Sequence, residues 1–165
     1  MPTTYKPIAT TTLGSAAASI TFSSIASSWT DLRLVLIGTS SAGGTGYIRF
    51  NSDSGTNYSV TFLRGNGSAA SSVRSTNRTE LIFNGDTGIS TTIPTMALVD
   101  VFSYTASTNK TALLTSEEDA NGSGSVERMV GMWRNTSAIT TITLSLSGGN
   151  FASGFTATLY GVKNA

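Results

Sequence analysis

The stretch DLRLVLIG, residues Asp31–Gly38, indicates the fold class of this chain. Its leucines, from Leu32 to Leu36, recur at every second position and so share one face of an extended strand. The opposite face carries Val35 and Ile37 and is also largely apolar. A strand that is apolar on both faces is typical of the interior of a sheet or of the space between two sheets. We therefore expect a central β-strand over this stretch.

The same period-two alternation continues through the rest of the chain. Over Ile142–Ser147, aliphatic side chains alternate with hydroxyls, which predicts a half-buried strand with a polar outer face. Over Met96–Ser103, Asp100 falls on an otherwise apolar face, so we expect an arginine or a backbone N–H to be its partner. We expect nine or ten short strands in all, over Ser19–Phe22, Asp31–Gly38, Tyr47–Phe50, Tyr58–Arg64, Thr79–Phe83, Met96–Ser103, Lys110–Ser116, Val126–Arg134, Ile142–Ser147 and Phe155–Tyr160.

Turns rich in glycine and asparagine separate these segments, for example Gly65–Gly67 and Gly148–Asn150. Both residue types adopt the positive φ that tight turns need. Many short strands with regular turns predict an all-β fold, a two-sheet antiparallel sandwich. Within that class we favour a jelly roll of two four-stranded sheets plus arms, because no internal repeat of about 40 residues indicates a propeller.

At 165 residues the chain fits one domain, which we place at residues 13–165. Residues 1–12 differ from the rest, because they contain two prolines and several threonines, with only Tyr5 and Ile8 as apolar anchors. We interpret them as an extended N-terminal arm. The arm could lie as an edge segment on its own domain, or it could reach onto a neighbouring subunit.

The chain has no histidine and no cysteine, while nearly a third of its residues are serine or threonine. Without these two residue types there can be no Ser-His-Asp triad, no cysteine nucleophile and no histidine- or thiolate-bound metal. Lys6 and Lys163 do not stand in an S-x-x-K arrangement, and the S-x-x-K spacing of Ser107 and Lys110 does not by itself identify a catalytic pair. Paired carboxylates could hydrolyse a glycoside, but no pairing follows from their spacing. We therefore expect a protein that is not an enzyme and that uses no cofactor.

Charge is sparse along the chain. Charged residues make up 12% of it, and the net charge is +1. Lysine and arginine are nowhere clustered, so nucleic acid is not an expected partner. No apolar stretch approaches the length of a membrane span, and residues 1–18 lack the apolar core of a secretory signal. We therefore expect no membrane partner either.

Three local patterns have two interpretations each. The segment Asn51–Asn57 places oxygen-bearing side chains at alternate positions, as in a Ca²⁺ loop, but it lacks the further acids of such a loop, so we favour an Asx-type turn. The run Glu117–Asp119 could bind a cation, although we favour a solvated acidic loop. Trp29 and Trp133, with several tyrosines, could form a platform for sugar stacking, but aromatic residues in strands more often pack in a core.

Three groups of segments, taken together, resemble a known family. The first group is Phe22–Ile25 with Trp29–Leu32, the second is Phe50–Ser59 with Leu63–Gly67, and the third is Trp133–Thr140 with Gly149–Phe151 and Thr158–Val162. They extend over most of the chain after its N-terminal segment. They resemble small virion structural proteins of tailed bacteriophages, especially those of marine and cyanobacterial phages.

The resemblance implies one of two roles and carries over no catalytic residue. The first role is that of a capsid decoration (cement) protein, which braces the shell of the major capsid protein on the virion surface after synthesis in the host cytoplasm. We expect such a protein to be a homotrimer, because closed threefold symmetry matches the local symmetry of a capsid. The second role is that of a tail-fibre or baseplate module that recognises a glycan on the host surface.

For contact with a partner we expect two regions. One is the N-terminal arm, through Tyr5 and Ile8, and the other is a set of arginine-bearing loops, through Arg64, Arg74 and Arg78. Arginine can pair bidentately with carboxylates on a partner protein. The alternative for these three arginines is an ordinary solvated loop.

Overall fold

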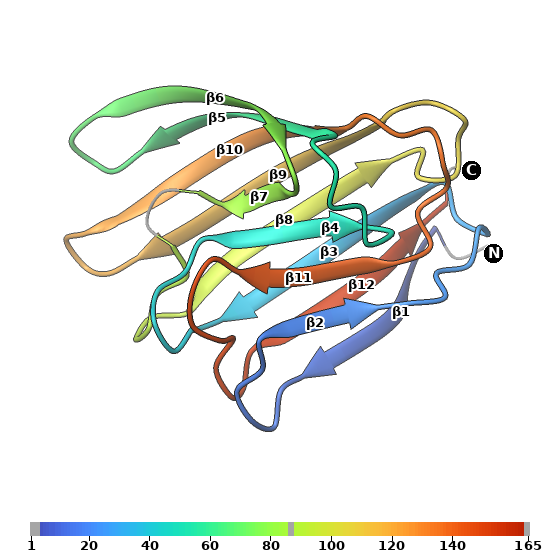
Figure 1. Cartoon of the computed structure of the whole chain (residues 1–165). Coiled ribbons are helices and arrows are strands. Elements are labelled where there is room, and N and C mark those ends of the chain that lie inside the picture. The colour runs from blue at the N-terminus through green and yellow to red at the C-terminus, as the bar shows by residue number, and fades with distance from the viewer. Residues whose placement is uncertain (1–3, 86–87, 164–165) are drawn as a thin grey trace.

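The structure is a computed structural model that describes residues 4–85 and 88–163. Within these residues, twelve β-strands form two antiparallel sheets that pack as a sandwich (Figure 1). The strands are β1 (Tyr5–Thr12), β2 (Ser19–Phe22), β3 (Asp31–Gly38), β4 (Gly46–Phe50), β5 (Tyr58–Gly65), β6 (Ala70–Arg78), β7 (Leu81–Asn84), β8 (Thr95–Phe102), β9 (Lys110–Asp119), β10 (Gly124–Trp133), β11 (Ile142–Leu146) and β12 (Thr156–Val162). The large sheet has the order β1-β12-β3-β8-β9-β10-β5-β6, and the small sheet has the order β2-β11-β4-β7. The expected all-β, two-sheet antiparallel sandwich is therefore confirmed.

The two sheets are unequal, so the expectation of two four-stranded sheets is wrong. Each of the expected strands is present, with its ends shifted by a few residues at most. Sequence reasoning missed β6 and gave β1 only as an extended arm, and these two strands form the two edges of the large sheet. β6 is rich in serine, asparagine and arginine and is exposed along most of its length, so no apolar alternation marks it. Backbone pairing with β5 holds it in the sheet.

The N-terminal segment is an edge strand of its own domain. β1 pairs antiparallel with β12 from Tyr5 to Thr12. The register sets Thr10 opposite Thr158 and Thr12 opposite Thr156, with hydroxyl oxygens 3.1 and 3.0 Å apart in the two pairs. Of the two placements considered for the arm, the edge segment is therefore the one observed. Residues 1–3 of the arm lie outside the described residues.

The core fills the space between the sheets. β3 is the expected central strand, because it lies between β12 and β8 and because its three leucines, from Leu32 to Leu36, are buried. The small sheet contributes Ile48 and Leu144 to the same buried cluster. The opposite face of β3 is not covered, and Ile37 there is 45% exposed. The large sheet therefore buries one face and leaves the other accessible.

Asp100 has the partner that its position requires. The β3–β8 register sets Arg33 directly opposite Asp100. The guanidinium donates two hydrogen bonds to the carboxylate, Nε to Oδ1 at 2.5 Å and Nη2 to Oδ2 at 2.8 Å. These contacts confirm the expected arginine partner. The hydrogen bond to Asp100 raises the pKa of Arg33, and the pair adds no net charge to the uncovered face.

Gly161 of β12 offers a test of the packing. An alanine Cβ at Gly161 would overlap the ring of Trp29, whereas a Cβ at Gly14 would meet no atom within 4 Å. Because overpacking costs about 1–3 kcal/mol, Gly161→Ala should lower the free energy of unfolding by about 2 kcal/mol. The matched control Gly14→Ala should change it by less than about 1 kcal/mol. Urea titration followed by tryptophan fluorescence measures both, and equal stability of the two variants would contradict the close contact.

Candidate functional site

The uncovered face of the large sheet is the main surface feature of the molecule. Figure 1 shows the small sheet, β2, β11, β4 and β7, lying against one side of the large sheet. On the other side, alternate residues of each strand point away from the core, and we call this side the outer face. Apart from Tyr5 on β1, six large apolar side chains of the described residues are exposed on the outer face. We call them the outer patch, and they are Ile37, Leu63, Met96, Phe102, Val126 and Val130.

The strand register brings the members of the outer patch close together, with the exposed Arg128 between Val126 and Val130. Val130 lies opposite Leu113 of β9 and Thr61 of β5. The half-buried Leu98 and Leu113 fill the middle of the face, between the exposed members. Leu63, Val126 and Val130 are 59%, 53% and 48% exposed. Single exposed apolar residues are ordinary, but a contiguous apolar patch marks a surface that binds another molecule.

An aromatic pair extends the outer face to the β1 edge. The rings of Tyr5 and Tyr160 stack with their centroids 4.5 Å apart, and the Arg33 guanidinium lies 6.0 Å from the centroid of the Tyr5 ring. Burial raises the pKa of Tyr5. Tyr5 and Ile8 are nevertheless both exposed, so the two expected contact residues of the N-terminal segment are accessible on β1.

The three arginines expected to contact a partner do not lie in loops, so that part of the prediction is wrong. Arg64 belongs to β5, and Arg74 and Arg78 belong to β6. Arg74 is paired with Thr61 and shares the outer face, whereas Arg64 alternates onto the opposite side of the sheet. The guanidinium of Arg78 lies 5.8 Å from the ring centroid of Tyr47 in the small sheet. The structure therefore brings only Arg74 to the face that carries the outer patch.

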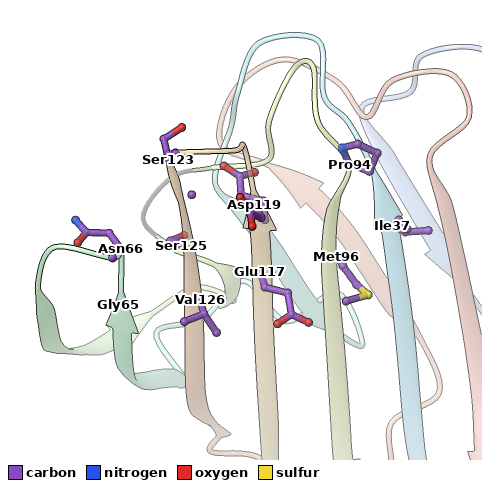
Figure 2. A pocket seen from close by; sticks show the side chains of 14 residues that line it. Ile37, Gly65, Asn66, Pro94, Met96, Glu117, Asp119, Ser123, Ser125 and Val126 are labelled. Carbon is purple, nitrogen blue, oxygen red and sulfur yellow. The ribbon is translucent and has the colours of Figure 1, made fainter.

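A groove of about 770 Å³ lies at one end of the outer face (Figure 2). It is lined by β3, β8, β9 and β10 and by the glycine-rich turns that follow β5 and β9. Its lining includes the run Glu117–Asp119. This run is the end of β9 and not a loop, which corrects the sequence-based prediction. Among the described residues, no group of three or more carboxylates is placed to hold a metal ion.

Two of these carboxylates are held by hydrogen bonds. Glu118 accepts one from the hydroxyl of Thr95 at 2.8 Å, and Asp119 accepts one from the backbone N–H of Asn121 at 2.9 Å. Glu117 is half-buried and takes part in neither the Arg33–Asp100 nor the Arg49–Glu80 ion pair. Glu117 is therefore the acid in the groove that is best placed to meet an incoming cation.

The segment Asn51–Asn57 forms the expected Asx-type turn. Asp53 Oδ1 accepts a hydrogen bond from the N–H of Gly55 at 2.8 Å, while Oδ2 accepts from Asn57 Nδ2 at 2.9 Å and from Trp133 Nε1 at 2.7 Å. Burial alone would raise the pKa of Asp53, but these hydrogen bonds outweigh it and lower the pKa below its usual value. The carboxylate thus anchors the turn to the core.

The larger aromatic residues belong to the core and not to the surface. Trp133 is 1% exposed and packs with Phe50 and Tyr58, at ring-centroid distances of 5.6 and 6.2 Å. Tyr104 is also buried, and Trp29 packs partly buried against the core. Core packing is therefore confirmed for these residues, and Trp133 is not accessible to stack on a sugar.

Comparison of the chain with protein-family models, with curated proteins and with solved structures found no match. Within the described residues, no helix is both long enough and apolar enough to cross a membrane.

Sequence reasoning did not identify the outer patch as a site. The available signal is the second apolar face of Asp31–Gly38, with Val35 and Ile37, which by itself predicts burial between sheets. That prediction assumes that both faces of the strand are covered. Because the small sheet lies on one side only, the same pattern here marks an accessible apolar face.

Tyr58 provides a pH test of the buried aromatic cluster. Burial raises the pKa of Tyr58 from 10.0 to about 12, because an ionised phenol would lose its hydration in the core. A group whose folded pKa lies above its unfolded pKa stabilises the fold fully below the unfolded value, and this stabilisation is lost as the pH rises to the folded value. The free energy of unfolding should therefore fall between pH 10 and about 12. Tyr58→Phe should show a shallower fall over the same window.

Urea titrations at neutral pH and across that window measure both proteins. At neutral pH, Tyr58→Phe loses the hydrogen bond that the N–H of Phe50 donates to the hydroxyl at 3.1 Å, which costs about 1 kcal/mol. This offset does not depend on alkaline titration, so the slopes remain comparable. Equal slopes in the two proteins would contradict the buried, neutral state of Tyr58.

Proposed function

We propose that this protein is a structural protein of a tailed-bacteriophage virion, a capsid decoration protein that binds the major capsid protein through its outer face. The outer patch carries the proposal, because an eight-stranded sheet exposes large apolar side chains on one face. Covering apolar surface of this kind with a partner is favourable, since it removes that surface from water. The virion context comes from the sequence resemblance.

The size of the outer face supports this use. Neighbouring strands lie about 4.8 Å apart and rise about 3.3 Å per residue, so eight strands of about eight residues cover roughly 34 by 26 Å. This is about 900 Å², and a standard protein interface buries about 800 Å² on each partner. The outer face is therefore large enough for a stable contact with one partner.

The chemistry of the outer face also supports a protein partner. The centres of protein interfaces are poor in unpaired charge and rich in methionine and aromatic residues. Met96 and Phe102 belong to the outer patch, and the charges of Arg33 and Asp100 neutralise each other, while Arg128 and Arg74 add exposed positive charge to the same face. Docking of a partner on this face thus leaves the Arg33–Asp100 pair intact.

We also propose that the sandwich is an expanded jelly roll, an architecture found in viral capsid proteins. From β2 to β11 the chain alternates between the sheets: β2 is in the small sheet, β3 in the large, β4 in the small, β5–β6 in the large, β7 in the small, β8–β10 in the large and β11 in the small. The first and last of these strands, β2 and β11, lie side by side, as the closure of a jelly roll requires. The expansion consists of the β8–β10 meander and the added β1–β12 edge.

The proposed assembly on the capsid is a homotrimer, since closed threefold symmetry suits the junctions between capsid subunits. The alternative, a tail module that binds host glycan, has less support, because Trp133 and Tyr58 are buried. The Tyr5–Tyr160 pair and the exposed Phe102 are aromatic side chains that remain accessible for such a role. Antibody labelling of virions in electron micrographs distinguishes a capsid location from a tail location.

A variant in the middle of the outer face tests the proposal. Val130→Asp places a charge in the outer patch, while Thr21→Asp places the same charge on an exposed position of the small sheet. Because an unpaired charge buried at an interface centre costs more than about 1.4 kcal/mol, Val130→Asp should reduce rebinding to capsids stripped of the native protein by more than about tenfold. Thr21→Asp should rebind like the native protein.

Gel densitometry of purified particles measures the rebinding, and thermal unfolding shows whether both variants remain folded. Native-like rebinding of a folded Val130→Asp variant would contradict the proposed interface. Stripped particles that withstand heat and osmotic shock as well as decorated ones would contradict the bracing role.

A further inference from the structure

The groove at the end of the outer face presents its side chains in a defined order. The strand register places Ile37, Met96, Glu117, Val126 and Gly65 on one line across β3, β8, β9, β10 and β5. Figure 2 shows the same order, with Glu117 between Met96 and Val126. A single carboxylate is thus flanked by apolar side chains on both sides, and the line ends at a glycine that leaves space above the sheet.

The groove is negatively charged. Its lining contains Glu117, Glu118 and Asp119 and, among the described residues, no lysine or arginine. Arg128 is the next outward-facing residue of β10 after Val126, but it lies opposite Thr115 and does not line the groove. A cation that enters the groove therefore meets the carboxylates of Glu117 and Asp119, and Arg128 is a diagonal neighbour of Glu117 outside the lining.

The dimensions of the line suit an extended chain. Five strands about 4.8 Å apart span about 19 Å, which an extended segment of about six residues covers at about 3.3 Å per residue. Side chains on the same side of such a segment recur about every 6.6 Å. If a cationic side chain lies above Glu117, its neighbours two residues before and after lie close to Met96 on one side and Val126 on the other.

We infer that the groove binds an extended basic segment of a protein partner, in which an arginine or lysine has apolar residues two positions before and after it. The inference deepens the proposed function and rests on it for the identity of the partner, because the groove shares Ile37, Met96 and Val126 with the outer patch. The carboxylate of Glu117 supplies the charge pairing. The apolar neighbours exclude water from the pair, which strengthens it relative to an exposed pair.

An NMR titration with synthetic peptides tests the inference. The probe is the peptide Ser-Leu-Thr-Arg-Thr-Leu-Ser, blocked at both ends and added to the ¹⁵N-labelled full chain. We expect saturable shifts of backbone signals at Ile37, Met96 and Val126. The same peptide with citrulline in place of arginine keeps the shape and loses the charge. Since a pair of this kind is worth about 1 kcal/mol, the citrulline peptide should bind about fivefold more weakly.

A protein variant provides the reciprocal test. Glu117→Gln keeps the shape of the side chain and removes its charge, so it should weaken binding of the arginine peptide about fivefold and leave binding of the citrulline peptide unchanged. Glu80→Gln makes the same change in net charge at a residue that pairs with Arg49 of the small sheet, and it should bind both peptides like the native protein. Thermal unfolding checks whether both variants remain folded.

Three results would each overturn the inference: equal binding of the arginine and citrulline peptides, native-like binding of the arginine peptide by Glu117→Gln, or no saturation at millimolar peptide. Failure of the inference is distinguishable from failure of the proposed function. If Val130→Asp rebinds capsids normally while Glu117→Gln loses the arginine peptide, the proposed capsid interface is contradicted and binding of the basic segment in the groove is supported. The opposite pattern supports the proposed capsid interface and contradicts binding of a basic segment in the groove.

Discussion

A β-sheet has two faces, and the described strands of this chain cover only one face of the large sheet. Eight strands form that sheet and four form the other. The buried leucines of β3 depend on this cover, because the small sheet is what removes them from water. The opposite face, with Ile37 and Val130, is apolar as well and has no such cover. The inequality of the two sheets therefore connects the fold to the proposed interface.

Many of the polar groups that could take part in chemistry are engaged within the fold. Asp100 is paired with Arg33, and Asp53 accepts hydrogen bonds that tie its turn to Trp133. The hydrogen bonds that Asp53 accepts lower its pKa, so this carboxylate is poorly suited to accept a proton near neutral pH. The threonine pairs between β1 and β12 likewise satisfy each other. These contacts stabilise the fold.

The outer face offers two kinds of contact at different places. Its middle carries the apolar side chains of Val130 and Leu113 beside the exposed Arg128, and burial of the apolar part supplies affinity. Its end carries Glu117 between Met96 and Val126, and a charge at a fixed position supplies selectivity and register more than affinity. In the proposed interface, a partner that matches only the apolar middle would bind in several positions. A partner that also brings a cation to Glu117 would bind in a single position.

The sequence by itself determined the strands that bury apolar side chains, because period-two alternation is a local property. Asp31–Gly38 and Ile142–Leu146 lie where the pattern predicts them. The absence of histidine and cysteine also limited the available chemistry. Only the tertiary structure decided the position of β6, because that strand buries little and is held by backbone pairing. The tertiary structure alone also decided the positions of the outer patch and the groove. Ile37 and Val126 are distant in the chain and share one line only through the register of four neighbouring strands, and the unequal division of strands between the sheets leaves them exposed.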